Sequence, residues 1–237
     1  MSRSGDPLAG LSFAPSGYLV EKPAPREAWA SFCPDQPEGV AFTRYAFPPG
    51  FLVINHLLND AVCDAIVAEC EQQQGVASTV STGDGAAGYR ESERRSDYIN
   101  PKSLSMDIGG LVAHAIREMV APFARIEPEW AEAPEILRYP VGGEFLPHAD
   151  ADVFDPQKKV WNRTENRDYS LLIYLNEGFE GGEIQFPNFG LSLAPRRGLL
   201  VGFPSDGRYV HAARPVTRGV KYALVTWLAT KGSPRTG

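Results

Sequence analysis

The hydrophobic positions of this chain follow a helical spacing in its first half. Between residues 59 and 74, apolar side chains recur every three or four positions, and Asn59 or Asp60 precedes them as an N-cap. A second helical pattern covers residues 108–120 and places its apolar side chains on one side. The sequence therefore predicts two amphipathic helices before residue 127.

After Glu127 the pattern changes to short apolar runs, each bounded by glycine, proline or asparagine. These runs are residues 135–139, 170–175, 182–186, 191–194, 198–203 and 222–228, and an earlier run covers residues 51–54. Many short strands without intervening helices favour a sandwich or a jelly roll. Residues 151–168 are polar and too long for a tight turn, so we expect a functional or mobile loop there.

The size and composition of the chain suit one domain. Its 237 residues, of which 43% are hydrophobic and 22% are charged, can bury an ordinary core. Eight prolines interrupt residues 1–50, which we expect to be an N-terminal extension without long helices. Residues 51–237 are expected to form a single domain, with helical support over 51–127 and a strand core over 128–230.

The charge and the cysteines narrow the class of partner. A formal net charge of −6 argues against a nucleic-acid partner, because a protein that binds nucleic acid needs a basic surface. No stretch has the length of a signal peptide's apolar run or the roughly 20 apolar residues of a membrane span. Three cysteines without zinc-site spacing are expected to be buried thiols in a reducing compartment. We therefore expect a cytoplasmic protein without membrane or nucleic-acid partners, and the sequence predicts no oligomeric state.

Two histidines and one aspartate have the spacing of a non-haem iron site. His148 and Asp150 are two residues apart, so on an extended strand they point to the same side. His211 would come from another strand of a rolled-up sheet. Two imidazoles and one carboxylate on one face of Fe(II) leave the other positions open for a keto acid and dioxygen. Asp152 shares the side of Asp150, but the His-any-Asp spacing favours Asp150.

Lys221 adds a second element to this pattern, because it begins the last predicted strand ten residues after His211. A buried ammonium group needs an anionic partner, and the distal carboxylate of 2-oxoglutarate is a suitable one. A non-catalytic cupin-like sensor, or a hydrolase or isomerase with another metal, would have no reason to hold that carboxylate. The combination therefore favours an oxygenase over these two alternatives.

Further motifs accompany these residues in a fixed order. In chain order they are Arg138-Tyr139-Pro140 with Gly143, His148-Ala149-Asp150, Arg167 to Ser170, Ile173 to Asn176, Gly181-Gly182-Glu183, Phe186-Pro187, His211, Pro215-Val216, Gly219, Lys221 and Trp227. With these motifs, the segment from about Phe51 to Leu228 resembles the prolyl 4-hydroxylase-like branch of the 2-oxoglutarate/Fe(II) dioxygenases.

The resemblance implies a mainly β fold with flanking helices, the double-stranded β-helix, which is a distorted, cupin-like jelly roll. It implies Fe(II) ligation by His148, Asp150 and His211. It implies that Lys221 pairs with the C5 carboxylate of the cosubstrate 2-oxoglutarate and that Tyr139 hydrogen-bonds it, and Tyr174 is similar to a cosubstrate-pocket tyrosine. The implied activity is hydroxylation of an unactivated C–H bond with dioxygen, and ascorbate is a further candidate cofactor.

The substrate-side positions are the part of the resemblance that varies. Arg167 and Trp227 match substrate-side positions of relatives, whereas Phe145 and Ala229 stand where peptide-hydroxylating relatives often carry a tyrosine and a histidine. These differences keep three substrate classes open, namely a peptidyl proline, a free amino acid or natural-product intermediate, and another macromolecule with a reactive methyl or methylene group. A basic cluster, Arg90, Arg94 and Arg95, either is solvated or holds an anionic group, and Arg95 is the candidate substrate residue from it.

Overall fold

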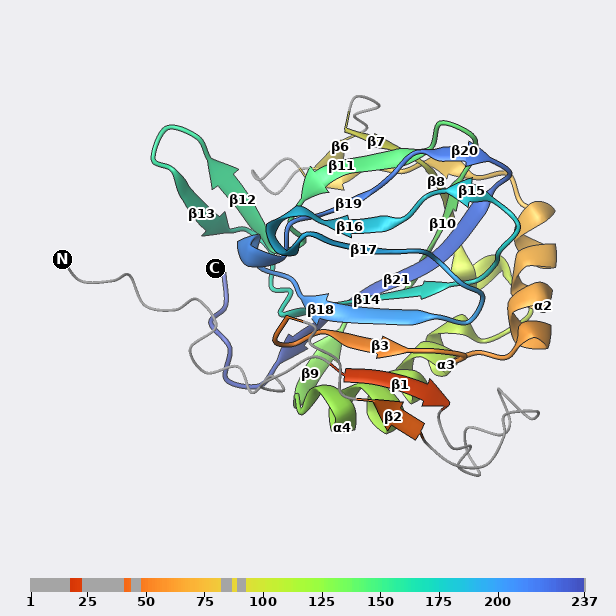
Figure 1. Cartoon of the computed structure of the whole chain (residues 1–237), viewed down its shortest axis with the longest axis horizontal. Helices are drawn as coiled ribbons and strands as arrows, with labels where there is room; N and C mark the ends of the chain where they lie inside the picture. Colours follow the sequence, from red (N-terminus) through yellow and green to blue (C-terminus); the bar gives the residue numbers. More distant parts are fainter. Residues whose placement is uncertain (1–17, 23–40, 44–47, 82–86, 89–92, 237) are drawn as a thin grey trace.

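Two sheets that face each other form the centre of the molecule, and their strands are antiparallel except for one parallel pair, Tyr18–Lys22 with Leu52–Ile54. The computed structural model describes residues 18–22, 41–43, 48–81, 87–88 and 93–236 (Figure 1). Within these residues, the main sheet has ten strands in the order β2-β1-β3-β18-β14-β21-β10-β8-β4, with β9 paired to β21. Its strands are β1 Tyr18–Lys22, β2 Ala41–Thr43, β3 Leu52–Ile54, β4 Val76–Ala77, β8 Asp97–Ile99, β9 Pro128–Ala131, β10 Glu135–Tyr139, β14 Tyr169–Tyr174, β18 Leu200–Pro204 and β21 Lys221–Thr230.

The second sheet has the order β17-β16-β19-β11-β7. Its strands are β7 Arg94–Arg95, β11 Glu144–His148, β16 Ile184–Phe186, β17 Leu191–Leu193 and β19 His211–Ala213. Three strand pairs complete the described β structure, namely β5 Val80–Ser81 with β6 Ala87–Gly88, β12 Asp152–Asp155 with β13 Val160–Arg163, and β15 Glu180–Gly181 with β20 Val216–Arg218. The predicted mainly β fold is confirmed, and all seven predicted apolar runs overlap strands, namely β3, β10, β14, β16, β17, β18 and β21.

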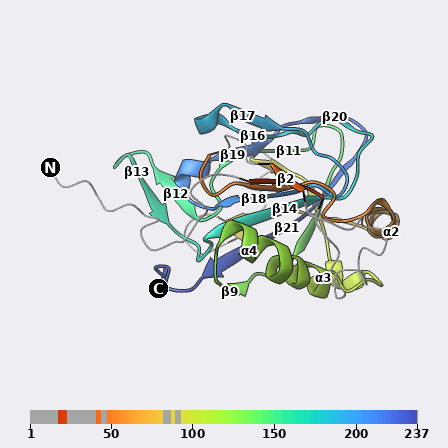
Figure 2. The same cartoon turned by 60° about the horizontal axis from the view of Figure 1, so that its bottom comes forward.

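Helices cover the outer face of the main sheet (Figure 2). Helix α2 spans Asp60–Glu71, and its N-cap Asn59 accepts a hydrogen bond from the backbone N–H of Val62 at 2.9 Å. Helix α3, Ile108–Ala115, continues through a π-helical turn η2, Ile116–Val120, into α4, Ala121–Ala124. Three 3₁₀ turns, η1 Pro101–Ser103, η3 Pro187–Phe189 and η4 Gly207–Tyr209, join other elements. The two predicted helices are present, the first ending three residues earlier than expected and the second extending four residues further.

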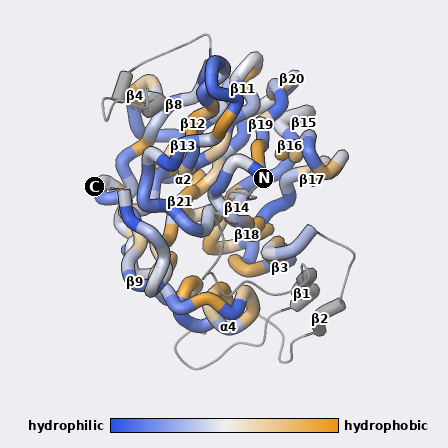
Figure 3. The backbone as a smooth tube through the Cα atoms, turned by 90° about the vertical axis from the view of Figure 1, so that its left-hand side faces the viewer, coloured by the Kyte–Doolittle hydropathy of each residue, from blue (hydrophilic) through white to orange (hydrophobic). Residues whose placement is uncertain are grey.

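The core has two parts, one on each side of the main sheet. One face of the sheet packs against the helices through buried side chains such as Leu111, Val120 and Leu224. The inner face packs against the second sheet through an aromatic cluster in which the rings of Phe51 and Phe186 lie 4.7 Å apart, edge to face. Figure 3 shows hydrophobic segments on α4 and on the strands β3 and β18. Burial on both faces thus fixes β14 and β21 as the rigid centre from which the site is built.

The expectation of a loop over residues 151–168 needs correction, because this segment contains the β12–β13 hairpin, which projects from the body in Figure 1. Its apolar side chains, which include Phe154 and Trp161 with ring centroids 5.3 Å apart, remain about two-fifths exposed. A hairpin that buries neither face shows no clear alternation of apolar and polar residues in the sequence. The prediction of a loop therefore followed from the polar composition of the segment. None of the helices in the described ranges is long and apolar enough to cross a membrane, and the predicted compartment stays a prediction.

Candidate functional site

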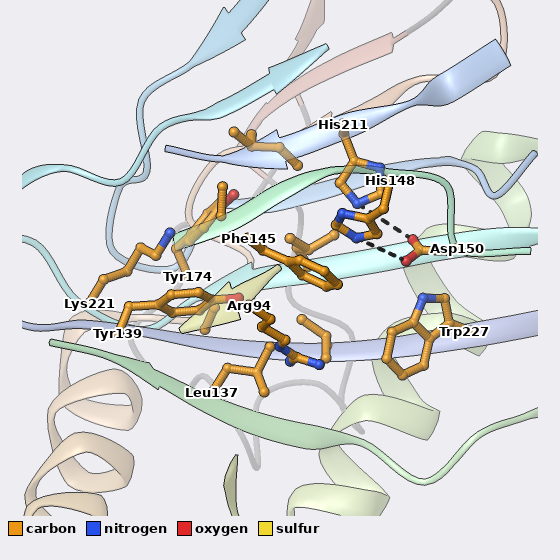
Figure 4. A pocket seen from close by; sticks show the side chains of 15 residues that line it. Arg94, Leu137, Tyr139, Phe145, His148, Asp150, Tyr174, His211, Lys221 and Trp227 are labelled. Atoms are coloured by element: carbon orange, nitrogen blue, oxygen red, sulfur yellow. Dashed lines mark ion pairs between the residues drawn. The ribbon is translucent and has the colours of Figure 1, made fainter. Parts of the chain in front are cut away.

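A cavity with an empty volume of about 560 Å³ lies between the two sheets (Figure 4). Alternate residues of β21, from Lys221 to Trp227, point into it because successive side chains of a strand lie on opposite faces. The lining residues are Arg94, Leu137, Tyr139, Phe145, His148, Asp150, Leu172, Tyr174, Ile184, His211, Ala213, Lys221, Ala223, Val225 and Trp227. The cavity is therefore mostly apolar, with polar groups gathered at defined places.

His148 and His211 lie directly opposite each other on neighbouring antiparallel strands. They are register partners of β11 and β19, and their ring centroids are 4.3 Å apart. Nδ1 of His148 lies 2.8 Å from the carbonyl oxygen of Leu146, and Nδ1 of His211 lies 3.1 Å from that of Tyr209. A carbonyl oxygen can only accept, so the proton is assigned to Nδ1 in both rings and Nε2 keeps its lone pair.

Asp150 follows β11 in a bend and brings its carboxylate to these two nitrogens. Its Oδ1 lies 3.6 Å from Nε2 of His148, and its Oδ2 lies 3.7 Å from Nε2 of His211. Oδ2 also accepts a hydrogen bond of 2.6 Å from the hydroxyl group of Ser170. Burial alone would raise the pKa of Asp150, but the two neighbouring imidazoles and the Ser170 hydroxyl outweigh it and hold the pKa well below its usual range.

The three side chains have the chemistry of a metal site. Their candidate ligand atoms all lie within 4.8 Å of one another. Burial, with a smaller contribution from His148, lowers the pKa of His211 to about 4, so this imidazole is neutral near pH 7. Neutral imidazole nitrogens and an ionised carboxylate are the donors that Fe(II) accepts, so the donor set fits the expected ion. Asp152 is not part of the group, because its Oδ2 accepts the backbone N–H of Gly207 at 2.8 Å.

Lys221 lies at the other end of the cavity, with its side chain 2% exposed (Figure 4). Its Nζ donates to the carbonyl oxygen of Gly182 at 2.9 Å and stands 4.2 Å from the ring centroid of Tyr139. Burial lowers the pKa of Lys221 to about 7, against an opposing effect of Glu183. Among the described residues no carboxylate forms an ion pair with it, so the ammonium group can accept an anionic ligand.

Tyr139 and Tyr174 flank this end of the cavity, and both are almost fully buried. Burial raises the pKa of both phenols, so both hydroxyl groups keep their protons and can donate hydrogen bonds. For Tyr139, Arg94 and Ser96 lower the pKa in part. The structure therefore brings all three predicted cosubstrate residues to one place.

Two of the four candidate substrate residues line the cavity. The ring of Phe145 stacks on that of His148, with centroids 3.6 Å apart and an angle of 18°. Trp227 lines the cavity beyond Asp150, and the guanidinium carbon of Arg167 lies 3.8 Å from the centroid of its ring. Arg167 itself is held by both carboxylate oxygens of Glu132, at 2.5 and 2.7 Å. The structure thus gives Arg167 a supporting position behind Trp227 rather than one on the cavity wall.

The fourth candidate, Arg95, is exposed and does not line the cavity. Its neighbour Arg94 does, because consecutive residues of β7 point to opposite sides of the strand. Arg90, the third member of the predicted basic cluster, lies outside the described residues. The sequence indicated the cluster, with Arg95 as its candidate substrate residue. A two-residue strand such as β7 has too few positions to show which side chain faces the cavity.

Comparisons with known proteins agree with this geometry. Residues 134–229 match the family model of the 2OG-Fe(II) oxygenase superfamily. Prolyl 3-hydroxylase 2 of Rattus norvegicus is 36% identical over 89 residues, which are 34% of this chain and 13% of that protein. Prolyl 4-hydroxylase 1 of Arabidopsis thaliana is 26% identical over 212 residues, covering 79% of this chain and 71% of that protein. The chain thus spans only a small part of the prolyl 3-hydroxylase but most of the plant protein.

Solved structures of similar fold include a Pseudomonas putida prolyl-4-hydroxylase, with a TM-score of 0.56 and 24% identity, covering 77% of this chain and 94% of that one. A Trichoplax adhaerens prolyl hydroxylase in complex with a peptide fragment has a TM-score of 0.60 and 16% identity, covering 78% of this chain and 85% of that one. These likenesses confirm the predicted double-stranded β-helix.

Proposed function

We propose that this chain hydroxylates an unactivated C–H bond with 2-oxoglutarate as cosubstrate, as a prolyl 4-hydroxylase-like member of the 2OG-Fe(II) oxygenase superfamily. One observation carries the proposal. A single cavity has a His-Asp-His group at one end and a buried lysine, without a described acidic partner, at the other. A metal-binding sensor or a hydrolase would need only the first of these features.

In this proposal His148, Asp150 and His211 hold Fe(II). When bound, the ion supplies the redox chemistry that couples oxidative decarboxylation of 2-oxoglutarate by dioxygen to hydroxylation of the substrate. The protein contributes the placement of the donors. The carbonyl groups behind each imidazole fix its Nε2, and Ser170 fixes the carboxylate of Asp150. Ascorbate would act from solution to keep the iron reduced.

Lys221 binds the C5 carboxylate of 2-oxoglutarate in this proposal. An ammonium group buried in an apolar cavity gains more from a carboxylate than an exposed one does, because water no longer screens the pair. Tyr139 and Tyr174 keep their protons and can donate to the same ligand. The apolar lining, which includes Leu137, excludes water from the reacting groups.

Phe145 and Trp227 form the proposed substrate side of the cavity, with Arg167 and its partner Glu132 fixing the plane of Trp227. Peptides are one proposed substrate class, because the relatives are named prolyl hydroxylases and one similar structure holds a peptide. A free amino acid or natural-product intermediate is the second. The apolar face of Phe145, stacked on His148, favours it because no hydroxyl group is offered to a peptide backbone there.

The test is reconstitution with Fe(II) and labelled 2-oxoglutarate under argon, followed by admission of oxygen and measurement of labelled succinate. We expect succinate only with the metal present, and no succinate from His148→Ala. Lys221→Ala should lose affinity for 2-oxoglutarate while it still binds the metal. Absence of both succinate and 2-oxoglutarate binding in the metal-loaded wild-type protein would refute the proposal.

A further inference from the structure

The cavity contains one buried cation that binds neither the metal nor the cosubstrate in the proposed function. Arg94 is 7% exposed, and it is the only arginine of the described residues that is buried. Figure 4 shows its side chain next to Phe145, between Tyr139 and Trp227. Its guanidinium carbon lies 4.9 Å from the centroid of Phe145, whose other neighbour is the ring of His148. One aromatic ring therefore separates Arg94 from a proposed iron ligand.

The contacts of Arg94 are with neutral groups, one of which is the phenol of Tyr139. Its Nε donates to Oγ of Ser96 at 3.1 Å, and its Nη1 donates to the carbonyl oxygen of Thr79 at 3.0 Å. These bonds fix the orientation of the guanidinium group but do not neutralise its charge. A buried charge without an ionic partner is destabilising, so such a group is expected to have a ligand.

Other arginines of the described chain show the usual solution. Each of three half-buried arginines forms an ion pair with one acidic side chain, namely Arg138 with Asp97, Arg163 with Asp168, and Arg167 with Glu132. Among the described residues no carboxylate forms such a pair with Arg94. Glu135 acts on Arg94 only at longer range. Burial raises the pKa of Glu135, and the charges of Arg94 and Arg167 lower that pKa in part.

The positive charge of Arg94 is not balanced by the proposed metal and cosubstrate. Fe(II) and Asp150 together carry one net positive charge, and Lys221 carries another. Dianionic 2-oxoglutarate balances these two charges. The charge of Arg94 then has no counterpart in the cavity, although the residue lies on the substrate side of Phe145.

We propose that Arg94 binds a carboxylate of the substrate, and that the enzyme therefore acts on an acidic molecule whose carboxylate lies close to the carbon that is hydroxylated. This inference rests on the proposed function and names the substrate class for it. A guanidinium group held by Ser96 and Thr79 presents a fixed fork of N–H donors, which matches the geometry of a carboxylate. A blocked peptidyl proline has no charge at this place, so the free acid is the favoured source of the carboxylate.

The experiment compares acids with their amides, which have nearly the same shape but no charge. Isobutyrate with isobutyramide, and N-acetyl-L-proline with its amide, are titrated calorimetrically under argon into the full chain loaded with Fe(II) and 2-oxoglutarate. We expect the acids to bind at least about tenfold more tightly, the effect of one charge-assisted hydrogen bond. The preference should disappear in Arg94→Gln, persist in part in Arg94→Lys, and remain in Arg95→Gln, which removes the same charge one residue away.

The outcomes separate the inference from the function on which it rests. Equal binding of acids and amides, no binding of any acid, or a preference that survives in Arg94→Gln would each overturn it. If Arg94→Gln instead weakens the binding of 2-oxoglutarate as much as Lys221→Ala does, Arg94 belongs to the cosubstrate site and the inference is also wrong. Binding of 2-oxoglutarate and formation of succinate by the wild-type protein test the proposed function independently. A blocked peptide amide with one aspartate, run in parallel, shows whether the carboxylate comes from a free acid or from an acidic side chain.

Discussion

The hydroxyl group of Ser170 donates a hydrogen bond of 2.6 Å to Oδ2 of Asp150. Ser170 is fully buried in β14, and its Oγ lies 2.7 Å from Oγ of Ser205. This contact connects the carboxylate of the candidate metal site to β14, a strand of the main sheet that is packed on both faces. Partners of this kind fix the direction in which a ligand offers its lone pairs to a metal.

Replacing Ser170 with alanine should therefore weaken metal binding without disturbing the fold. We expect the dissociation constant for Fe(II) to rise about 10- to 100-fold, the usual effect of removing a group that orients a ligand. Calorimetric titration under argon measures it. Ser205→Ala is the matched control, because it touches Asp150 only through Ser170 and should have a smaller effect. Equal affinities of Ser170→Ala and the wild-type protein would mean that the hydrogen bond has no orienting role.

Asp150 and Asp152 provide a second matched pair, because both were candidates for the metal ligand and only Asp150 approaches the two imidazoles. Asp150→Asn should lower the affinity for Fe(II) at least about a hundredfold, more than loss of an orienting partner does. Asp152→Asn should leave it nearly unchanged, because its carboxylate accepts from the backbone N–H of Gly207, and an amide oxygen can accept there as well. Metal content after dialysis distinguishes the two variants, and a large loss in Asp152→Asn would contradict the assignment.

Gly198 is a position where the fold depends on the absence of a side chain. Its φ is +73°, and a Cβ atom there would lie 2.1 Å from the carbonyl oxygen of Leu58. Gly190 has a similar φ of +60° but open space around it. We expect Gly190→Ala to cost about 1 kcal/mol, from backbone strain alone, and Gly198→Ala to cost roughly 3 kcal/mol or more because the clash adds to the strain. Urea denaturation measures both, and equal costs would show that the contact with Leu58 relaxes easily.

The fold could be predicted from the sequence where burial was strong. Strands such as β14 and β21 are packed on both faces, so they appear as continuous apolar runs between turn residues. Helix α2 had both a hydrophobic period and an N-cap at Asn59. The β12–β13 hairpin was missed because neither of its faces packs into the core, so its side chains carry no burial pattern.

The site could be predicted only as far as residue type and spacing carry information. Two histidines, an aspartate and a lysine at these distances along a chain are typical of few kinds of site, so their spacing indicates the chemistry. Ser170 and Glu132 were not predicted as site residues, because a serine or a glutamate acquires its role only from the packing around it. The choice between Arg94 and Arg95 depended on the phase of a two-residue strand, which only its pairing with β11 determines. Sequence thus indicated the chemistry, and tertiary contacts decided which neighbours support it.

Lys221 should make the binding of 2-oxoglutarate depend on pH in the neutral range. Burial lowers its pKa to about 7 in the ligand-free protein, and only the protonated form attracts a carboxylate. Above about pH 7 the amine of Lys221 is mostly neutral and must take up a proton before it can bind the carboxylate. The dissociation constant of 2-oxoglutarate should therefore rise by up to about tenfold per pH unit. Below about pH 7 the affinity should be nearly constant.

The same pKa predicts the opposite trend for the stability of the ligand-free fold. The pKa of Lys221 is about 7 in the folded protein, against the ordinary lysine value of 10.5 in the unfolded chain, so between these limits the unfolded chain binds more protons. Stability should therefore increase with pH across this window, while 2-oxoglutarate binding weakens. Lys221→Met is the control, because it fills the same space without a titrating group and should remove both trends. Calorimetric titration of 2-oxoglutarate and urea denaturation, each between about pH 6.5 and 8.5, measure the two trends. Affinity that stays constant over this range in the wild-type protein would show that Lys221 is protonated throughout and that burial alone does not control its charge.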